Sequence, residues 1–147
     1  MLIKKLTTEA CVNLLNRSRL GRLGCAHEGQ PYVTPFYFAY QDGYFYGFST
    51  VGQKIEWMRM NSKVCVEVDE VSSEAHWITV VVLGRYEELR QTPEFDDIRD
   101  HAYRLLGKHA MWWETAAASR SIHRPAEPLF YRIEALQITG HSAEPRP

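Results

Sequence analysis

The chain has 147 residues, of which 45% are hydrophobic, and its 17 Lys and Arg almost balance 18 Asp and Glu. This length and apolar fraction suit one globular domain with a single core. The near-zero net charge argues against a nucleic-acid partner, because phosphate binding normally needs an excess of Lys and Arg on one face.

The three cysteines, Cys11, Cys25 and Cys65, are widely spaced and include no Cys-x-x-Cys pair. They argue against a disulfide framework and against a zinc knuckle, and they fit buried thiols in a reducing compartment. Residues 1–9 lack the apolar core of a signal peptide, and no apolar run approaches the roughly 20 residues that span a bilayer. We therefore expect a cytoplasmic protein without a membrane partner.

The first half of the chain predicts a short helix followed by a β-meander. Thr7 or Thr8 can cap a helix whose apolar stripe includes Leu14 and Leu15, a pattern typical of a helix start. Three strands are then expected at residues 21–27, 31–40 and 44–49, with Asp42-Gly43 as the hairpin signal between the last two.

The second half alternates helices with longer strands. A helix is expected at residues 52–61, and strands at 63–69 and 76–89. Thr92-Pro93-Glu94 marks the start of a helix through Leu106, because Pro is favoured at the first helical position and an acid in the first turn. A helical piece at 111–119, a last strand at 129–140 and a flexible tail at 141–147 complete the expected order.

These six strands predict a mainly β domain with flanking helices that spans residues 1–147. Mostly consecutive antiparallel strands favour a small closed or nearly closed barrel, since closure removes exposed strand edges. The stretch from Ile78 to Leu83 is apolar on both faces and must be covered on both sides. Because a small barrel does not cover its own outer surface, we expect a homodimer.

The segment from Phe48 to Lys54 is the first candidate for a binding site. A strand end is followed there by Ser49 and Thr50, and then by Gln53 and Lys54 at a helix start. Backbone amides at a helix N-terminus, a hydroxyl and an ammonium group together can bind a phosphate, although the glycine spacing is not that of a Walker loop. The alternative is that the hydroxyls only cap the helix and that Lys54 is solvated.

The second candidate is the stretch between Tyr32 and Phe48, which holds half of the 18 aromatic residues. Pro35 interrupts an otherwise strong strand and cannot donate a ladder hydrogen bond, so it marks an edge or a bulge whose backbone groups can face a ligand. The flanking aromatic side chains could stack on a planar ring. An aromatic-rich barrel core is the alternative explanation.

No metal-site or hydrolase motif occurs. The six histidines are scattered without His-x-x-x-His spacing, and there is no Gly-x-Ser-x-Gly nucleophile elbow. Trp112 and Trp113, with His109 and His123 nearby, could form a wall beside a ligand or could simply pack a helix.

Several short motifs occur in an order that resembles one known family. They are Gly21-Arg22-Leu23-Gly24, Gly29-Gln30-Pro31-Tyr32-Val33-Thr34-Pro35-Phe36, Tyr44-Phe45-Tyr46-Gly47-Phe48-Ser49, Gly52-Gln53-Lys54, Asn61-Ser62-Lys63-Val64-Cys65 and Thr79-Val80-Val81-Val82-Leu83-Gly84-Arg85. This ordered set is similar to the pyridoxamine 5′-phosphate oxidase-like flavoproteins, and within them to the branch that includes the nitroimidazole reductases. The similarity covers residues 6–89 well and the C-terminal third loosely.

The resemblance implies a six-stranded antiparallel split β-barrel that holds FMN non-covalently at the interface of a homodimer. It also implies three groups of cofactor contacts. The flavin ring would contact Tyr32, Val33, Thr34, Pro35 and Phe36; the ribityl chain and phosphate would lie beside Phe48, Ser49 and Thr50, with Gln53 and Lys54 on the phosphate; and Thr79 would point to the flavin from the long strand.

The implied activity is that of an FMN-dependent oxidoreductase, which passes electrons from a reduced donor through the flavin to a small planar acceptor such as a nitroaromatic or a quinone. No catalytic side chain is named, because the flavin supplies the redox chemistry. The last strand ends in Ile138-Thr139-Gly140-His141-Ser142 instead of the Trp and Arg signature of the true vitamin oxidases, so that reaction is not expected. The alternatives are haem or deazaflavin as cofactor, and a non-catalytic flavin- or haem-binding module.

Overall fold

The computed structural model describes residues 1–107 and 129–147. In chain order its elements are β1 (Leu2–Lys5), α1 (Thr8–Arg17), β2 (Leu20–His27), β3 (Gln30–Gln41), β4 (Tyr44–Ser49), α2 (Gln53–Met60), β5 (Lys63–Ser73), β6 (His76–Leu89), a 3₁₀ turn (Pro93–Phe95), α3 (Asp96–Leu106) and β7 (Leu129–Glu144). None of the helices in these two ranges is long and apolar enough to cross a membrane. The helical piece expected at 111–119, with His109, Trp112, Trp113 and His123, lies outside the described residues.

The strands form one antiparallel sheet in the order β1-β7-β4-β3-β2-β5-β6, with a further pairing between β6 and β7. Residues 129–134 of β7 pair with β4 on one edge, and residues 130–134 pair with the end of β6 on the other. This double pairing closes the sheet on itself. The expected mainly β barrel with flanking helices is therefore confirmed.

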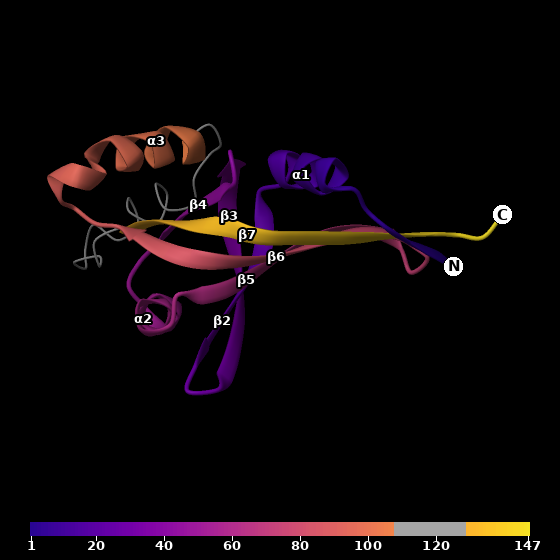
Figure 1. Cartoon of the computed structure of the whole chain (residues 1–147), viewed down its shortest axis with the longest axis horizontal. Helices are drawn as coiled ribbons and strands as arrows, with labels where there is room; N and C mark the ends of the chain where they lie inside the picture. Colours follow the sequence, from indigo (N-terminus) through magenta and orange to yellow (C-terminus); the bar gives the residue numbers. More distant parts are fainter. Residues whose placement is uncertain (108–128) are drawn as a thin grey trace, which may run out of the picture.

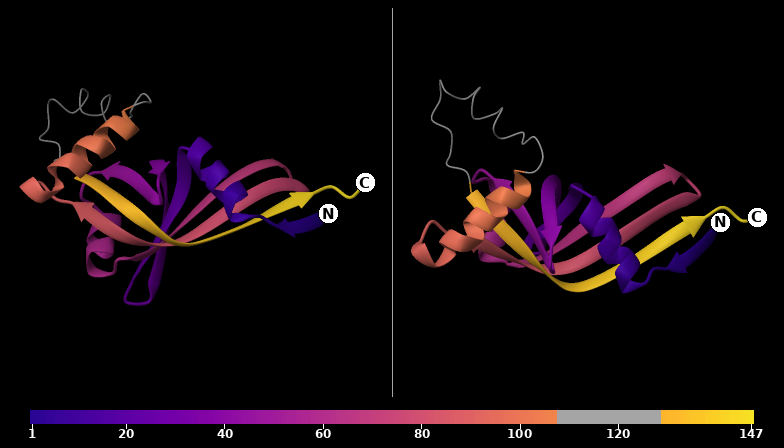
Figure 2. Two further views of the ribbon diagram at one scale, coloured as in Figure 1. Left: turned by 45° about the horizontal axis from the view of Figure 1, so that its top comes forward. Right: turned by 90° about the horizontal axis from the view of Figure 1, so that it is seen from above.

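Part of the sheet continues beyond the barrel as an extended arm. Figure 1 shows the ends of β5, β6 and β7 running away from the barrel together with β1, and both chain termini at the tip of this arm. In Figure 2, α1 lies where the arm leaves the barrel, and α3 lies at the opposite end of the molecule.

The arm is where the sequence-based expectation was wrong. The closed barrel has the six expected strands, β2 to β7, but the described residues contain a seventh strand, β1, which pairs with the end of β7, Lys5 opposite His141 and Leu2 opposite Glu144. Strand β7 runs to Glu144, so the expected tail does not begin at His141. All of β1 is exposed, and a short strand without a buried face carries no alternating pattern from which it could be predicted.

Two clusters of buried side chains hold the helices to the barrel. The larger cluster fills the barrel and receives Leu14 and Leu15 from α1. The smaller cluster packs Leu106 of α3 against Tyr46 and Phe48 of β4. Because side chains alternate along a strand, α3 covers the face of β4 that points away from the barrel interior.

Strands β5 and β6 bury one face and expose the other. The buried positions include Val64, Val66 and Val68 of β5, as the alternation there predicted, and Val80 and Val82 of β6. On the opposite face, which we call the outer face, Val81 is 38% and Leu83 is 48% exposed. We expected residues 78–83 to be covered on both faces. Among the residues that the structure describes, cover is present on the barrel side, and Val81 and Leu83 remain partly exposed on the outer face.

Gly47 provides a direct test of how tightly the barrel is packed. A Cβ at Gly47 would lie 2.6 Å from Cζ of Tyr131, whereas a Cβ at Gly52 would have no neighbour within 4 Å. We expect Gly47→Ala to lower the free energy of unfolding by roughly 1–3 kcal/mol through overpacking. The comparison variant Gly52→Ala, at the N-cap of α2, meets no packed atom and should lower it by less than Gly47→Ala does, through weaker capping. Urea unfolding measures both, and equal stability of the two variants would contradict this packing.

Candidate functional site

A pocket of about 490 Å³ lies where β3, β4 and the start of α2 meet. Its lining residues are Leu20, Pro35, Phe36, Tyr37, Phe48, Ser49 and Lys54. We call it the aromatic pocket. The tertiary structure thus brings residues from both predicted segments together, Pro35 and Phe36 from one and Phe48, Ser49 and Lys54 from the other.

Along this pocket the backbone of β3 is paired on only one side. Strand β2 pairs with β3 from Gln30 to Tyr37, but β4 pairs with it only from Phe38 to Gln41. Pro35, which has no amide proton to donate, lies in the part of β3 without a β4 partner. The strand edge expected at Pro35 is therefore confirmed, and it borders the aromatic pocket.

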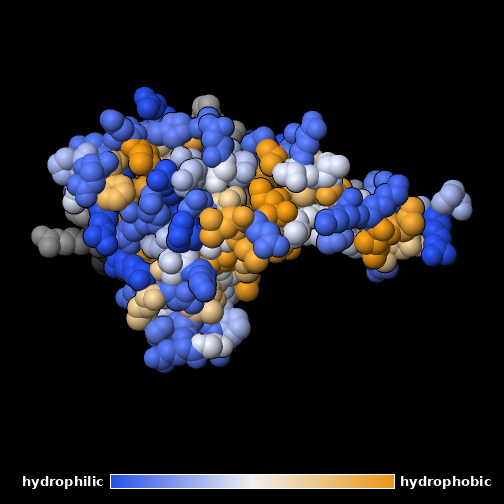
Figure 3. Space-filling model, in the orientation of Figure 1, coloured by the Kyte–Doolittle hydropathy of each residue, from blue (hydrophilic) through white to orange (hydrophobic). Residues whose placement is uncertain are grey.

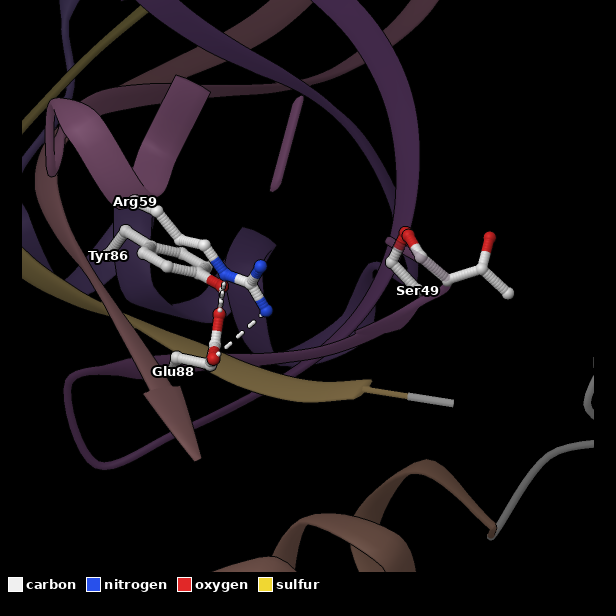
Figure 4. A network of polar contacts seen from close by, with 5 residues as sticks. Ser49, Arg59, Tyr86 and Glu88 are labelled. Carbon is white, nitrogen blue, oxygen red and sulfur yellow. Dashed lines mark hydrogen bonds and ion pairs between the residues drawn. The ribbon is translucent and has the colours of Figure 1, made fainter. Parts of the chain in front are cut away.

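Ser49 and Lys54 form the polar end of the aromatic pocket. Ser49 is the last residue of β4 (Figure 4), and its hydroxyl donates to the Thr50 carbonyl at 2.9 Å. Helix α2 begins at Gln53, and its N-cap residue Gly52 makes no side-chain hydrogen bond to it. Among the described residues, no N-cap side chain therefore accepts from the first amides of α2, which makes them available to solvent or to an anion.

Lys54 is a half-buried cation in this polar end. Burial lowers its pKa below the usual lysine value, and the Cys25 thiol acts in the opposite direction. Within the described ranges, no carboxylate contributes to the pKa of Lys54. Because an uncompensated buried charge is costly, an anionic ligand in the pocket would stabilise the charged form of Lys54.

Cys25 is the group that the structure places near Lys54, and the sequence did not reveal this proximity. Burial raises the pKa of Cys25, while Lys54 lowers it and Cys65 raises it. The net effect is a raised pKa, which keeps the thiol protonated at neutral pH. The burial expected from the sequence is confirmed for Cys11 and Cys25 and is wrong for Cys65, which is exposed on β5.

Three predicted residues flank the aromatic pocket without lining it. Thr50 directly follows β4 and is half-buried, whereas Gln53 is the first residue of α2 and is exposed. Thr34 precedes Pro35 and is half-buried, with its hydroxyl 3.4 Å from the Pro35 carbonyl oxygen. Their predicted contacts with a cofactor stay predictions.

Tyr32 and Val33 line a different pocket. It has a volume of about 520 Å³ and nearly apolar walls, which also include Cys65, Leu83 and Leu136. The Tyr32 ring packs edge-on against Trp57 of α2, with 5.8 Å between ring centroids. This second pocket opens on the outer face, next to the aromatic pocket along β3.

The structure does not bring Thr79 to the aromatic pocket. Thr79 lies on the outer face of β6, where its hydroxyl donates to Oε2 of Glu67 at 3.2 Å. Its cross-strand partner on β5 is Asp69. Within one chain, Thr79 therefore belongs to a polar cluster on the outer face.

Leu20 and Tyr37 line the aromatic pocket but were not among the predicted site residues. They are cross-strand partners in β2 and β3. Tyr37 follows Pro35 by two residues, so the period of a strand places both side chains on one face and could have identified it. Leu20 can be identified as a lining residue only once the register between β2 and β3 is known.

A network of polar contacts fixes the helix that carries Lys54. Arg59 Nε lies 2.7 Å from Oε1 of Glu88, and the Tyr86 hydroxyl donates to the same oxygen at 2.9 Å (Figure 4). Burial raises the pKa of Glu88, but the hydrogen bonds from Arg59 and Tyr86 outweigh it and leave the pKa below its ordinary value. The network joins α2 to β6 and so restrains the orientation of α2.

A family model described as pyridoxamine 5′-phosphate oxidase matches residues 7–142. The chain belongs to the pyridoxamine 5′-phosphate oxidase family. An uncharacterised protein of Rhizobium meliloti (strain 1021) is 36% identical over 146 residues, which cover 97% of each chain. The family inferred from the order of the sequence motifs is thereby confirmed.

Solved structures share the fold of this family member. A FAD-binding protein from Mesorhizobium loti is 46% identical, with a TM-score of 0.83 over 98% of this chain and 100% of that chain. The FAD-binding protein of Mycobacterium smegmatis is 20% identical, with a TM-score of 0.73 over 97% and 100% of the two chains. A Bacteroides thetaiotaomicron protein assigned to 5-nitroimidazole antibiotic resistance is 19% identical, with a TM-score of 0.69 over 97% and 89%.

The environment of Lys54 predicts an unusual titration in the ligand-free family member. Because burial disfavours the charged ammonium, we expect Lys54 to lose its proton at a lower pH than a free lysine side chain. NMR titration of ¹³C-methylated lysines measures this, and the missing signal in Lys54→Arg assigns the resonance. Added inorganic phosphate should raise the pKa of Lys54. A titration at or above the usual lysine value would contradict the described burial.

Proposed function

We propose that this member of the pyridoxamine 5′-phosphate oxidase family is an FMN-dependent oxidoreductase and that the aromatic pocket holds the cofactor. The observation that carries the proposal is the position of Lys54, a half-buried cation without a carboxylate partner in the described chain, at the polar end of an aromatic-lined pocket. The 46% identical relative, named as a FAD-binding protein, supports a flavin as the ligand.

The polar end of the pocket suits a phosphate group. Lys54 would supply a charge-assisted hydrogen bond, and the Ser49 hydroxyl lies at the adjoining strand end. The uncapped amides at the start of α2 add a partial positive charge. These groups together would hold one phosphate without any excess of basic residues in the chain.

The apolar end of the pocket suits a planar ring. Phe36, Tyr37 and Phe48 provide aromatic surface there, and aromatic faces pack favourably on planar groups. The edge of β3 near Pro35 has no β4 partner, so its backbone can hydrogen-bond to polar ring atoms. A bound flavin would supply hydride acceptance and electron transfer to a small planar acceptor, while the chain sets binding and access.

FMN is the proposed cofactor because the aromatic pocket accounts for a ring and one phosphate. The phosphate end is open: Val51 and Gln53 are exposed, and nothing lies within 4 Å of a Cβ built at Gly52. The AMP half of FAD could extend through this opening, as the name of the Mesorhizobium relative suggests for that protein. Within the described ranges no histidine lines the aromatic pocket, which favours a flavin over haem.

The cofactor proposal is tested by releasing the bound group from purified protein and identifying it by chromatography and absorbance. We expect FMN. Release of FAD would replace FMN as the assigned cofactor but keep the flavin site. A Soret band, or failure to bind added flavin, would overturn the flavin site itself. Anaerobic reduction by NADH or NADPH, followed by reoxidation with a nitroaromatic or a quinone, tests the oxidoreductase activity. If the flavin binds but is reoxidised by neither acceptor, the result would favour the alternative of a non-catalytic flavin-binding module.

Lys54→Ala tests the phosphate contact. Removing a charge-assisted hydrogen bond should weaken FMN binding by roughly 1.5–3 kcal/mol, measured by fluorescence titration. The affinity for riboflavin, which lacks the phosphate, should change much less. Lys5→Ala, at an exposed position of β1, is the matched control and should bind FMN as the wild type does. Equal FMN affinities of Lys54→Ala and Lys5→Ala would reject the assigned role of Lys54.

We also propose that two copies associate through the outer face. This face exposes Val33, Val81, Leu83 and Leu136, and apolar surface gathers over the middle of β6 and β7 in Figure 3. Association would give Tyr32, Val33 and Thr79, which do not line the aromatic pocket, a route to the site of the partner subunit. Multi-angle light scattering at micromolar concentration should give twice the chain mass of 17.1 kDa, and a clean monomer would contradict this.

A further inference from the structure

Two carboxylates lie side by side on the outer face. Glu67 and Asp69 are two residues apart on β5, so they point to the same side of the sheet. Glu67 is the cross-strand partner of Arg22 on β2, and Asp69 is the partner of Thr79 on β6. Arg22 Nη1 lies 4.0 Å from Oδ2 of Asp69, and Thr79 donates to Glu67 at 3.2 Å. We call these four residues the outer-face cluster.

The cluster borders the apolar part of the outer face. On β6, the cross-strand partner of Glu67 is Val81, and Leu83 follows it on the same side. On the other flank, Arg22 pairs with Pro35 at the rim of the aromatic pocket. The cluster therefore lies between the apolar patch and the proposed cofactor site, where a partner covering the patch would also cover the carboxylates.

The charges of the cluster are not balanced when both acids are ionised. Burial raises the pKa of Glu67 to about 7, the hydrogen bond and charge of Asp69 raise it too, and Thr79 and Arg22 act in the opposite direction. The other titratable groups nearby are Cys65, two residues before Glu67 on β5, and His141, the partner of Thr79 on β7. Near neutral pH, the carboxylate pair therefore exchanges a proton with solvent.

We propose that association of two copies through the outer face takes up protons at Glu67, so that neutral to alkaline pH weakens the dimer. This inference rests on the homodimer of the proposed function. The occupant is a second copy because the face carries both signs of charge beside an apolar band. In a two-fold contact, Arg22 of each copy can then meet Asp69 of the other, so that the one arginine of each copy is matched by one carboxylate and Glu67 is covered without a cation.

The direction of this pH dependence follows from the cost of burying charge. Covering the cluster removes water from Glu67, and this disfavours the ionised form. The pKa of Glu67 is then higher in the dimer than in the free chain, so the dimer binds more protons. By linkage, the dissociation constant of the dimer rises as the pH rises through the pKa that Glu67 has in the free chain.

Fluorescence-detected sedimentation of the labelled full chain measures the dissociation constant down to picomolar concentrations. If covering raises the pKa of Glu67 by about one unit in each subunit, the constant should increase by roughly tenfold or more between pH 6 and pH 8. A constant that is equal at the two pH values would overturn the proposal.

Glu67→Gln keeps the size and hydrogen-bonding capacity of the side chain but cannot ionise. We expect this variant to dimerise at pH 8 about as tightly as the wild type does at pH 6, with little dependence on pH. Glu74→Gln, in the exposed turn between β5 and β6, is the matched control and should retain the wild-type dependence. His141→Asn should retain it as well. A pH dependence that survives in Glu67→Gln, or disappears in His141→Asn, would reject Glu67 as the responsible group.

The outcomes separate this inference from the proposed function. A monomer at both pH values overturns the homodimer and the proton linkage together. A dimer with a pH-independent constant overturns only the linkage. Flavin binding is measured separately, as the FMN affinity of Lys54→Ala. If that experiment rejects the cofactor assignment, the sedimentation result can still be interpreted.

Discussion

Strand β7 imposes the constraint on which the rest of the structure depends, because it is paired along both edges. Its first residues pair with β4 on one side and with the end of β6 on the other, and its last residues pair with β1. An open sheet of this length would leave long apolar strands with unpaired edges. Closure through β7 removes those edges and creates the interior that the barrel side chains fill.

The same closure determines where the aromatic pocket forms. Strand β4 pairs with β7 along its whole length but with β3 only from Phe38 onward. Within the described residues, the earlier part of β3 therefore has no strand partner on this edge. Lys54 of α2 lies at the same pocket, and α2 is held to β6 through Arg59 and Glu88. The aromatic pocket is thus a consequence of incomplete strand pairing and not of a dedicated loop motif. This explains why no single short sequence pattern marks the site.

Two groups of charges are incompletely balanced, one in this pocket and one on the outer face. Lys54 is a cation without a carboxylate partner in the described chain, and Glu67 and Asp69 share one arginine. A formal net charge of -1 conceals both. Local charge, set by which strands are neighbours, decides what each surface can bind, because Coulomb interactions weaken with distance and are screened by salt.

The sequence by itself determined the features that depend on near neighbours: the alternation of β5, the turn at Asp42-Gly43, and the strand end at Ser49 followed by the start of α2. It also determined the family, through the order of motifs. Only the tertiary structure decided that β1 pairs with the end of β7, that Lys54 lies near Cys25, and that Thr79 is separated from Lys54 within one chain. The physical reason is that periodicity, caps and turns act over a few residues, whereas strand register and the unpaired edge of β3 arise from pairings between segments far apart in the chain.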